Sequence, residues 1–271
     1  MNKHIALGLV NSLKIVRASE NGLYLSSSDN QEVLLPNRYM ISSMKIGDII
    51  DVFIYKDSKD RLVATTKRPY AMLGEFYNFR VVDVNKIGAF VDWGLPKDLF
   101  VPKSLQKTPL KISQKVILRV SVDQKSDRLI GSTKVQQFLS SNTKELKKDQ
   151  KIKLLIFAKT PMGYKVIVEN LYEGMLYYNE IFEDIKIGDH KIGFIKNIRQ
   201  DGKLDISLNP PKREKDEVAI KKVMQVLKEY DGVLPCDSKS DPKKIYKIFG
   251  LSKKSFKKAL NELKTNGVFD V

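Results

Sequence analysis

The chain has 271 residues, of which 48 are lysine or arginine and 32 are aspartate or glutamate, so its formal net charge is +16. The hydrophobic fraction of 42% can build packed cores and excludes a globally disordered chain, and no apolar run reaches the roughly 20 residues of a membrane span. Such an excess of positive charge predicts a polyanionic partner, and nucleic acid fits better than a phospholipid surface because no single amphipathic helix carries the charge.

The first expected feature along the chain is a repeated unit. Gly22–Leu25 returns as Gly88–Val91 at an offset of 66, and Gly163 follows Gly88 at an offset of 75. A Lys-Ile pair keeps the same two offsets, occurring at 45–46, 111–112 and 186–187. Several matches at fixed offsets indicate three tandem copies. We expect these copies to occupy residues 1–68, 69–140 and 141–211.

Each copy contains the pattern of five short strands. In the second copy these are expected at residues 79–84, 88–93, 99–101, 115–122 and 129–132, which are rich in β-branched and aromatic side chains. Hairpin turns are expected at Asn21-Gly22, Pro161–Gly163 and Asp201-Gly202. Five strands in about 65 residues are typical of the small OB barrel, whose sheet face binds oligonucleotides.

Alternation along the strands predicts which side chains face the core. In the fourth strand of the second copy one face carries Val116, Leu118, Val120 and Val122, and the other carries Lys115, Ile117, Arg119 and Ser121. In the second strand Ala89 and Val91 are the expected core residues, which places Phe90 on the outer face. Taken alone, an aromatic in a small barrel is as compatible with core packing as with a binding surface. We expect Trp93 to pack, and one ring of Tyr177-Tyr178 to be buried and the other exposed.

The last sixty residues change to a helical period. After an expected break over Pro210–Glu214, a first helix is predicted by the apolar spacing of Ile220, Val223, Met224, Leu227 and Tyr230. A second helix is expected from Asp241 to Gly250, and a third is capped by Ser252. With a short strand at Val268-Phe269, this layout predicts a winged helix over residues 212–271. The expected fold class is therefore mainly β, three five-stranded barrels followed by a small α/β domain.

Lysines gather on the expected outer face of the third helix, at positions 253, 254, 257, 258 and 264. We take Lys253 and Lys257 as candidate nucleic-acid contacts. The start of this helix lacks exposed Arg, Asn and Gln, which are the side chains suited to bidentate base readout. A structural or weakly RNA-binding role is favoured over sequence-specific DNA reading, which stays open as an alternative.

Charge is distributed unevenly along the chain. Residues 1–98 have a net charge of +2, residues 99–165 of +11, residues 166–210 of −3 and residues 211–271 of +6. A concentrated basic block is typical of a phosphate-binding surface. Lys115 and Arg119 are its candidate contacts.

The residues of catalytic chemistry are scarce. Cys236 is the only cysteine, and His4 and His190 are the only histidines. An internal disulfide and a cysteine zinc site are excluded, and a hydrolytic triad or an imidazole metal cage is not expected. We predict a cytoplasmic binding protein with no catalytic site, no cofactor and no metal.

The second copy resembles the S1 RNA-binding domain. The resemblance rests on Lys86–Gly94, Leu99–Ser104 and Val122–Arg128. It implies RNA-contacting roles for Phe90, Asp123 and Arg128. Ile87 occupies a second aromatic slot of the family and Pro102 its histidine slot, which reduces the expected stacking. By the same comparison the first copy offers Tyr24 and Arg61, and the third offers Tyr177 but has Lys165 in the aromatic slot.

Three S1-type copies followed by a winged helix are similar to the conserved virulence factor B family of bacterial S1 RNA-binding proteins. The resemblance implies a cytoplasmic protein that binds single-stranded RNA and regulates gene expression, including that of virulence factors, after transcription. Two alternatives remain at this point: a DNA-binding transcription regulator that uses the winged helix, and an adaptor associated with the ribosome or a nuclease.

Overall fold

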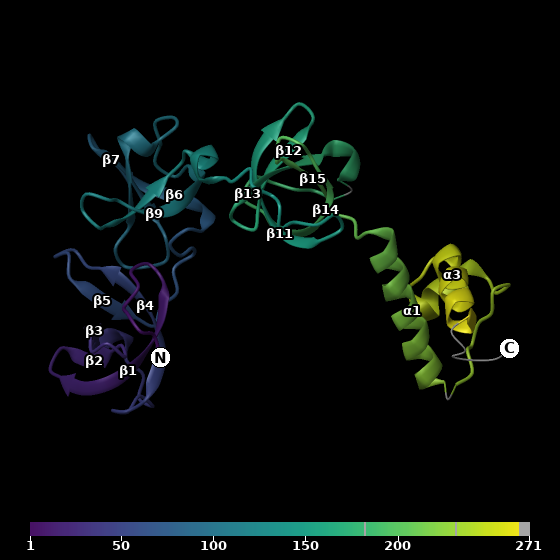
Figure 1. Ribbon diagram of the computed structural model, residues 1–271, viewed down its shortest axis with the longest axis horizontal. Helices are drawn as coiled ribbons and strands as arrows, with labels where there is room; N and C mark the ends of the chain where they lie inside the picture. Colours follow the sequence, from purple (N-terminus) through teal and green to yellow (C-terminus); the bar gives the residue numbers. More distant parts are fainter. Residues whose placement is uncertain (182, 231, 266–271) are drawn as a thin grey trace.

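The computed structural model describes residues 1–181, 183–230 and 232–265, and only the backbone of residues 212–215. Within these ranges it contains three closed five-stranded barrels followed by three α-helices (Figure 1). Barrel 1 consists of β1 (Val10–Ser19), β2 (Gly22–Ser26), β3 (Glu32–Pro36), β4 (Ile49–Lys56) and β5 (Leu62–Thr65). Barrel 2 consists of β6 (Phe76–Val84), β7 (Gly88–Asp92), β8 (Leu99–Pro102), β9 (Lys115–Val122) and β10 (Leu129–Ser132). Barrel 3 consists of β11 (Lys151–Thr160), β12 (Gly163–Val168), β13 (Tyr172–Tyr177), β14 (His190–Ile198) and β15 (Leu204–Ser207).

The three barrels share one topology. The first strand of each pairs with the second and fourth, and the third strand pairs in parallel with the fifth. Each first strand also has a register shift at the same place, after Ile15, Val81 and Ile156. The predicted repeat and the five strands predicted in the second copy are confirmed. Their ends differ at three strands: β6 begins three residues earlier, at Phe76, β7 ends one residue earlier, at Asp92, and β8 ends one residue later, at Pro102.

The repeated glycine has a steric cause. At this position the second strand lies so close to the third strand that any side chain would collide with the backbone of the third strand. A Cβ atom would lie 2.0, 2.4 and 2.1 Å from a carbonyl oxygen at Gly22, Gly88 and Gly163 respectively. Since real Cβ atoms do not approach oxygen so closely, each barrel needs glycine there.

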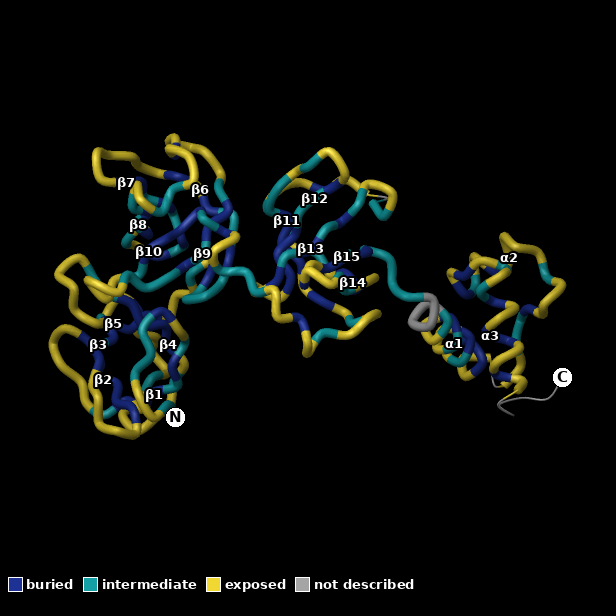
Figure 2. The backbone as a smooth tube through the Cα atoms, turned by 45° about the horizontal axis from the view of Figure 1, so that its top comes forward, coloured by how far each residue is buried: buried dark blue, intermediate teal, exposed yellow. Residues whose placement is uncertain are grey.

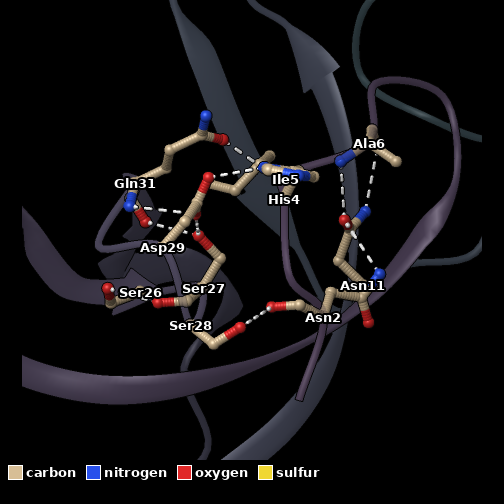
Figure 3. A network of polar contacts seen from close by, with 10 residues as sticks. All are labelled: Asn2, His4, Ile5, Ala6, Asn11, Ser26, Ser27, Ser28, Asp29 and Gln31. Atoms are coloured by element: carbon tan, nitrogen blue, oxygen red, sulfur yellow. Dashed lines mark hydrogen bonds and ion pairs between the residues drawn. The ribbon is translucent and has the colours of Figure 1, made fainter.

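The N-terminal segment is fastened to barrel 1 by side-chain hydrogen bonds (Figure 3). Asn11 is fully buried, accepts from the Ala6 N–H at 2.7 Å and donates to the carbonyls of Ala6 and Leu9, each at 2.9 Å. His4 contacts the Asp29 carboxylate at 2.6 Å. Further along the segment the Gly8 carbonyl accepts from the Leu73 N–H at 2.9 Å, so the segment also reaches the beginning of barrel 2.

Barrels 1 and 2 share a hydrophobic core. Phe53 of β4 packs edge-on against Trp93 of barrel 2 with ring centroids 5.9 Å apart. Trp93 is only 3% exposed, and its indole N–H donates to the Lys97 carbonyl at 2.6 Å. The prediction that Trp93 packs is confirmed, and its burial makes the junction of the two barrels part of one core.

Barrels 2 and 3 are also packed together. Phe76 and Ile117 of barrel 2 form an apolar cluster with Leu155 and Ile167 of barrel 3. The Asn170 side chain accepts from the Phe76 N–H at 3.2 Å. Leu118 and Val120 of β9 are fully buried inside barrel 2, as the alternation predicted. On the opposite face of β9, Ile117 is buried as well, because barrel 3 packs against it.

The C-terminal helices have a core of their own (Figure 2). They are α1 (Lys212–Glu229), α2 (Pro242–Phe249) and α3 (Lys253–Thr265). Asp241 caps α2 by accepting from the Lys243 N–H at 2.8 Å, and Gly250 ends it with φ of 60°. Ser252 caps α3 by accepting from the Ser255 N–H at 3.2 Å.

The connection between barrel 3 and α1 is shorter than expected. The break was expected to extend to Glu214, but α1 already begins at Lys212, because Pro210-Pro211 alone ends the barrel and proline is tolerated at the helix start. The strand expected at Val268-Phe269 lies outside the described residues. No helix among the described residues is both long and apolar enough to cross a membrane.

Candidate nucleic-acid interface

A concave aromatic surface lies on the outside of barrel 2 next to barrel 1, and we call it the aromatic face. It encloses about 470 Å³ and is lined by Tyr55, Lys56, Ile87, Phe90, Trp93, Pro96, Lys97, Asp98, Leu99, Phe100, Arg128, Leu129 and Ile130. Phe90 of β7 and Phe100 of β8 are directly opposed across the two strands, with ring centroids 5.1 Å apart. Both are half-buried, whereas Ala89 and Val91 are fully buried in the core. Phe90 therefore lies on the outer face, as alternation predicted.

Glycine makes room for this ring pair. A Cβ atom on Gly88 would lie 2.6 Å from the Phe100 ring. Ile87, directly before it, is 66% exposed at the rim of the concavity. The result is two adjoining aromatic rings with an apolar rim, a surface on which bases can stack.

Basic side chains border the aromatic face and also join barrel 1 to barrel 2. Lys97 donates to the carbonyls of Lys56 and Asp57 at 3.2 and 2.8 Å. Burial lowers the pKa of Lys97. Arg128 pairs with the Asp60 carboxylate. These cations are thus held in place by barrel 1, and they lie at the edge of the aromatic surface.

One carboxylate belongs to the same surface. Asp98 lines the concavity, and loss of hydration raises its pKa, with repulsion from Asp92 and Asp83 adding to the effect. A carboxylate beside an aromatic platform disfavours a phosphate when it is ionised, so Asp98 is expected to oppose nucleic-acid binding.

The candidate residues of the second copy do not come together at one place. Phe90 and Arg128 line the aromatic face, while Lys115 is exposed beside barrel 3. Asp123 shapes the turn before β10 by accepting from the Ser126 N–H at 3.1 Å and hydroxyl at 2.6 Å, and that hydroxyl bond chiefly lowers its pKa.

Arg119 lies at the junction with barrel 3. Its Nε donates to the Gly74 carbonyl at 3.1 Å, and its guanidinium lies over the rings of Phe138 at 4.7 Å and Phe76 at 5.9 Å. Burial lowers its pKa. Its contacts are therefore with the protein itself.

Candidates in the other two copies already have partners. The Tyr24 ring is covered by the Arg17 guanidinium, 3.4 Å from the ring centroid. Arg61 donates twice to the Asp57 carboxylate, at 2.7 and 3.0 Å.

In barrel 3 the hydroxyl of Tyr177 accepts a hydrogen bond from Arg199, which pairs with Asp205 at 2.6 Å. Tyr177 is half-buried and Tyr178 is 41% exposed, so the expected contrast between the two rings is present but weak.

The lysines of α3 differ in their availability. Lys253 was expected to be exposed, but it is half-buried and donates to the carbonyls of Lys239 and Ser240 at 3.1 and 2.8 Å. Because Lys253 lies in the first turn of α3, its side chain can extend back to the loop before α2, where its amine binds these two carbonyls. Lys258 pairs with Asp216, and Lys257 is exposed.

Sequence reasoning missed Phe100 and Lys97. Phe100 alternates with the core residues Leu99 and Val101, so the same two-residue period that placed Phe90 outside also predicts Phe100 outside. Lys97 acts through contacts with barrel 1, which no local pattern indicates. Among the described residues, no three His, Cys, Asp or Glu side chains lie close enough together to hold a metal ion.

Comparison with known proteins adds two domain assignments. The S1 domain matches residues 7–67, which form barrel 1, and a CvfB-like winged helix domain matches residues 221–269. The sequence resemblance had rested on the second copy. A protein of Staphylococcus saprophyticus named conserved virulence factor B is 25% identical over 98% of this chain and 92% of its own length. The chain is thus similar to proteins named conserved virulence factor B over nearly its whole length.

Other relatives extend over similar lengths. A Bacillus subtilis protein named uncharacterized protein YitL is 28% identical, covering 94% of this chain and 88% of its own. A crystal structure of a multidomain protein with nucleic acid binding domains from Streptococcus pneumoniae is 24% identical, with a TM-score of 0.43 over 98% of this chain and 95% of that one. The two matched domains are of nucleic-acid-binding types, and neither is of an enzyme family.

Proposed function

We propose that this chain binds single-stranded RNA on the aromatic face of barrel 2 and acts in the cytoplasm as a post-transcriptional regulator of gene expression, without catalysis. The observation that carries the proposal is the pair formed by Phe90 and Phe100. Two adjoining rings on the outside of an OB-type barrel offer stacking surfaces to successive bases, and stacking of this kind accepts any base.

Charge supports a nucleic-acid ligand for the same surface. Lys56, Lys97 and Arg128 border the concavity, so phosphates next to the stacked bases meet cations at its edge. RNA is favoured over DNA by the S1 domain in the family match and by the S1 resemblance of barrel 2. A role in virulence gene expression is supported by the name of the staphylococcal relatives.

Duplex DNA reading through the winged helix has less support. Of the two candidate contacts on α3, Lys253 donates its hydrogen bonds to the carbonyls of Lys239 and Ser240, and only Lys257 is exposed. Lysine contributes a point charge to a phosphate and little base selectivity.

A direct comparison of ligands tests the proposal. We expect the full chain to bind single-stranded RNA more tightly than single-stranded DNA or duplex DNA of matched sequence in fluorescence anisotropy. Trp93 is the only tryptophan and lines the aromatic face, so its emission should change on binding. Tightest binding to duplex DNA would favour the transcription-regulator alternative, and a co-purifying protein that survives RNase treatment would favour the adaptor.

A further inference from the structure

A second concavity lies between barrels 2 and 3, and we call it the lysine groove. It encloses about 430 Å³. Barrel 2 contributes Lys107 and Lys115, and barrel 3 contributes Lys159 and Lys165. The described residues that line it include no aspartate or glutamate. The groove thus has basic side chains on both walls.

Most of this positive charge is uncompensated. Lys165 pairs with Glu173 at 2.9 Å. Lys107, Lys115 and Lys159 are exposed, and within the described part of the chain none of them forms an ion pair. Amines that face one another across a groove without carboxylates attract a polyanion, and the apolar walls concentrate their field.

An aromatic ring lies among these lysines. Phe157 lines the groove and is half-buried. It falls at the register shift of β11 between Ile156 and Ala158, where one residue is left out of the ladder. A bulge of this kind redirects a side chain. A ring flanked by lysines is the combination that sites for single-stranded nucleic acid use to follow a sugar–phosphate backbone.

The two walls of the groove are held in a fixed relation. The apolar cluster that includes Phe76, Ile117 and Leu155 joins barrels 2 and 3 below it. Asn78 adds a hydrogen bond to the Ile187 carbonyl at 3.4 Å. The groove is therefore formed before any ligand arrives, which lowers the entropic cost of binding.

The lysine groove and the aromatic face are lined by residues that lie close together in and just after β10. Ile130 lines the aromatic face and Thr133 lines the groove, and three residues of extended chain span only about 10 Å. All four groove lysines also fall within residues 99–165, the block with a net charge of +11. The basic block of the sequence is thus partly gathered at one junction.

We propose that the lysine groove is a phosphate-binding track that carries the same RNA strand from the aromatic face of barrel 2 onto barrel 3. This inference rests on the proposed function. The groove would hold the sugar–phosphate backbone without reading bases, because lysine amines and threonine hydroxyls recognise phosphate oxygens.

The test is a pair of double variants in the full chain. Lys115→Gln with Lys159→Gln removes two groove amines. Lys148→Gln with Lys151→Gln removes the same charge from exposed positions of the same basic block, and Lys151 lies at the other end of β11, about 26 Å from Lys159. Exposed substitutions of this kind should leave the melting temperature of either variant nearly unchanged.

The readout is the dependence of RNA affinity on salt concentration. With an oligonucleotide of about 16 nucleotides, the groove variant should show a log–log slope shallower by about 1.4, or about 0.7 for each lost phosphate contact. The control variant should keep the wild-type slope. With an oligonucleotide of about 4 nucleotides, which one barrel can hold, both variants should match wild type.

If the two double variants show equal log–log slopes with the long oligonucleotide, the proposed phosphate track is overturned, because the change in net charge alone would then explain any loss of RNA affinity. The proposed function fails separately, if RNA leaves Trp93 emission unchanged and Phe90→Ala binds RNA like wild type. If the groove variant loses salt dependence while Phe90→Ala binds RNA like wild type, the proposal that one RNA strand occupies both surfaces is also contradicted.

Discussion

Arg128 of barrel 2 donates to the carboxylate of Asp60 in barrel 1, and the two residues are 68 positions apart in the sequence. Each belongs to the loop between the last two strands of its barrel. The hydrogen bond lowers the pKa of Asp60 and raises that of Arg128. The S1 resemblance implies an RNA contact for Arg128, but an RNA phosphate there has to share the guanidinium with Asp60.

Replacing Asp60 by Asn should therefore strengthen RNA binding. The substitution removes a negative charge and leaves the charge of Arg128 available to phosphate. Arg128→Ala should weaken binding. Glu20→Gln is the matched control, since it changes net charge equally at an exposed position of barrel 1. Anisotropy titrations at one salt concentration would measure all three, and an Asp60→Asn protein that binds no better than Glu20→Gln would contradict the expectation.

Phe90→Ala should cost about 1–3 kcal/mol of RNA binding, the usual contribution of one stacked base. The free energy of unfolding should fall by only about 1 kcal/mol, because the half-buried ring loses mainly its contact with Phe100. Phe79→Ala provides the core control, with an expected stability loss of about 3–5 kcal/mol at a fully buried position.

Melting temperature and affinity should be measured on the same samples. Tyr24→Ala should lose less binding than Phe90→Ala, because Arg17 already covers the ring. A large melting shift in Phe90→Ala with unchanged affinity of the folded protein would refute the stacking role.

We expect Lys115 to contribute to RNA binding and Arg119 to contribute to stability. Arg119→Ala should lower stability by about 1.5–3 kcal/mol, because a charged hydrogen bond to Gly74 is lost at the barrel 2–barrel 3 junction. Lys115→Ala should change stability by less than about 0.5 kcal/mol and reduce RNA affinity at low salt. Urea unfolding and salt titrations would show this, and similar stability losses in both variants would rule it out.

RNA affinity should depend on pH through Asp98. Its pKa is raised, so the folded protein binds this proton at a higher pH than a free aspartate does. As pH falls from neutral toward the pKa of Asp98, the carboxylate beside the aromatic face is neutralised and RNA binding should strengthen. Carboxylates with lowered pKa, such as Asp60 and Asp123, remain ionised in that window.

Asp98→Asn should remove this rise and bind more tightly than wild type at neutral pH. The comparison needs affinity measured over a pH series for both proteins at constant ionic strength. An identical pH dependence in wild type and Asp98→Asn would assign the effect to other groups.

Deleting residues 212–271 should leave the three barrels folded. The helices pack around their own core, and among the described residues this core shares none with the barrel cores. If α3 assists RNA binding through Lys257, the truncated protein should bind less tightly and with a shallower salt dependence. Circular dichroism melting and anisotropy would test both points, and unchanged affinity would assign α3 to another partner.

Local patterns were sufficient to predict most of the fold. The offsets of 66 and 75 revealed the repeat, and alternation placed Ala89 and Val91 in the core and Phe90 outside. Asp241, Gly250 and Ser252 marked helix ends. These features depend on the period of a strand or on hydrogen bonds within one turn, so residues close in sequence determine them.

Only the tertiary structure decided which surfaces remain free. Ile117 and Arg119 follow the same outward alternation as Lys115. Ile117 nevertheless packs against barrel 3, and the Arg119 guanidinium lies over Phe76 and Phe138, whereas Lys115 is exposed. Arg128 of barrel 2 pairs with Asp60 of barrel 1, and Lys115 and Lys159 line one groove from barrels 2 and 3. Contacts between domains depend on how closed barrels pack against one another, and no periodicity within a strand records that packing.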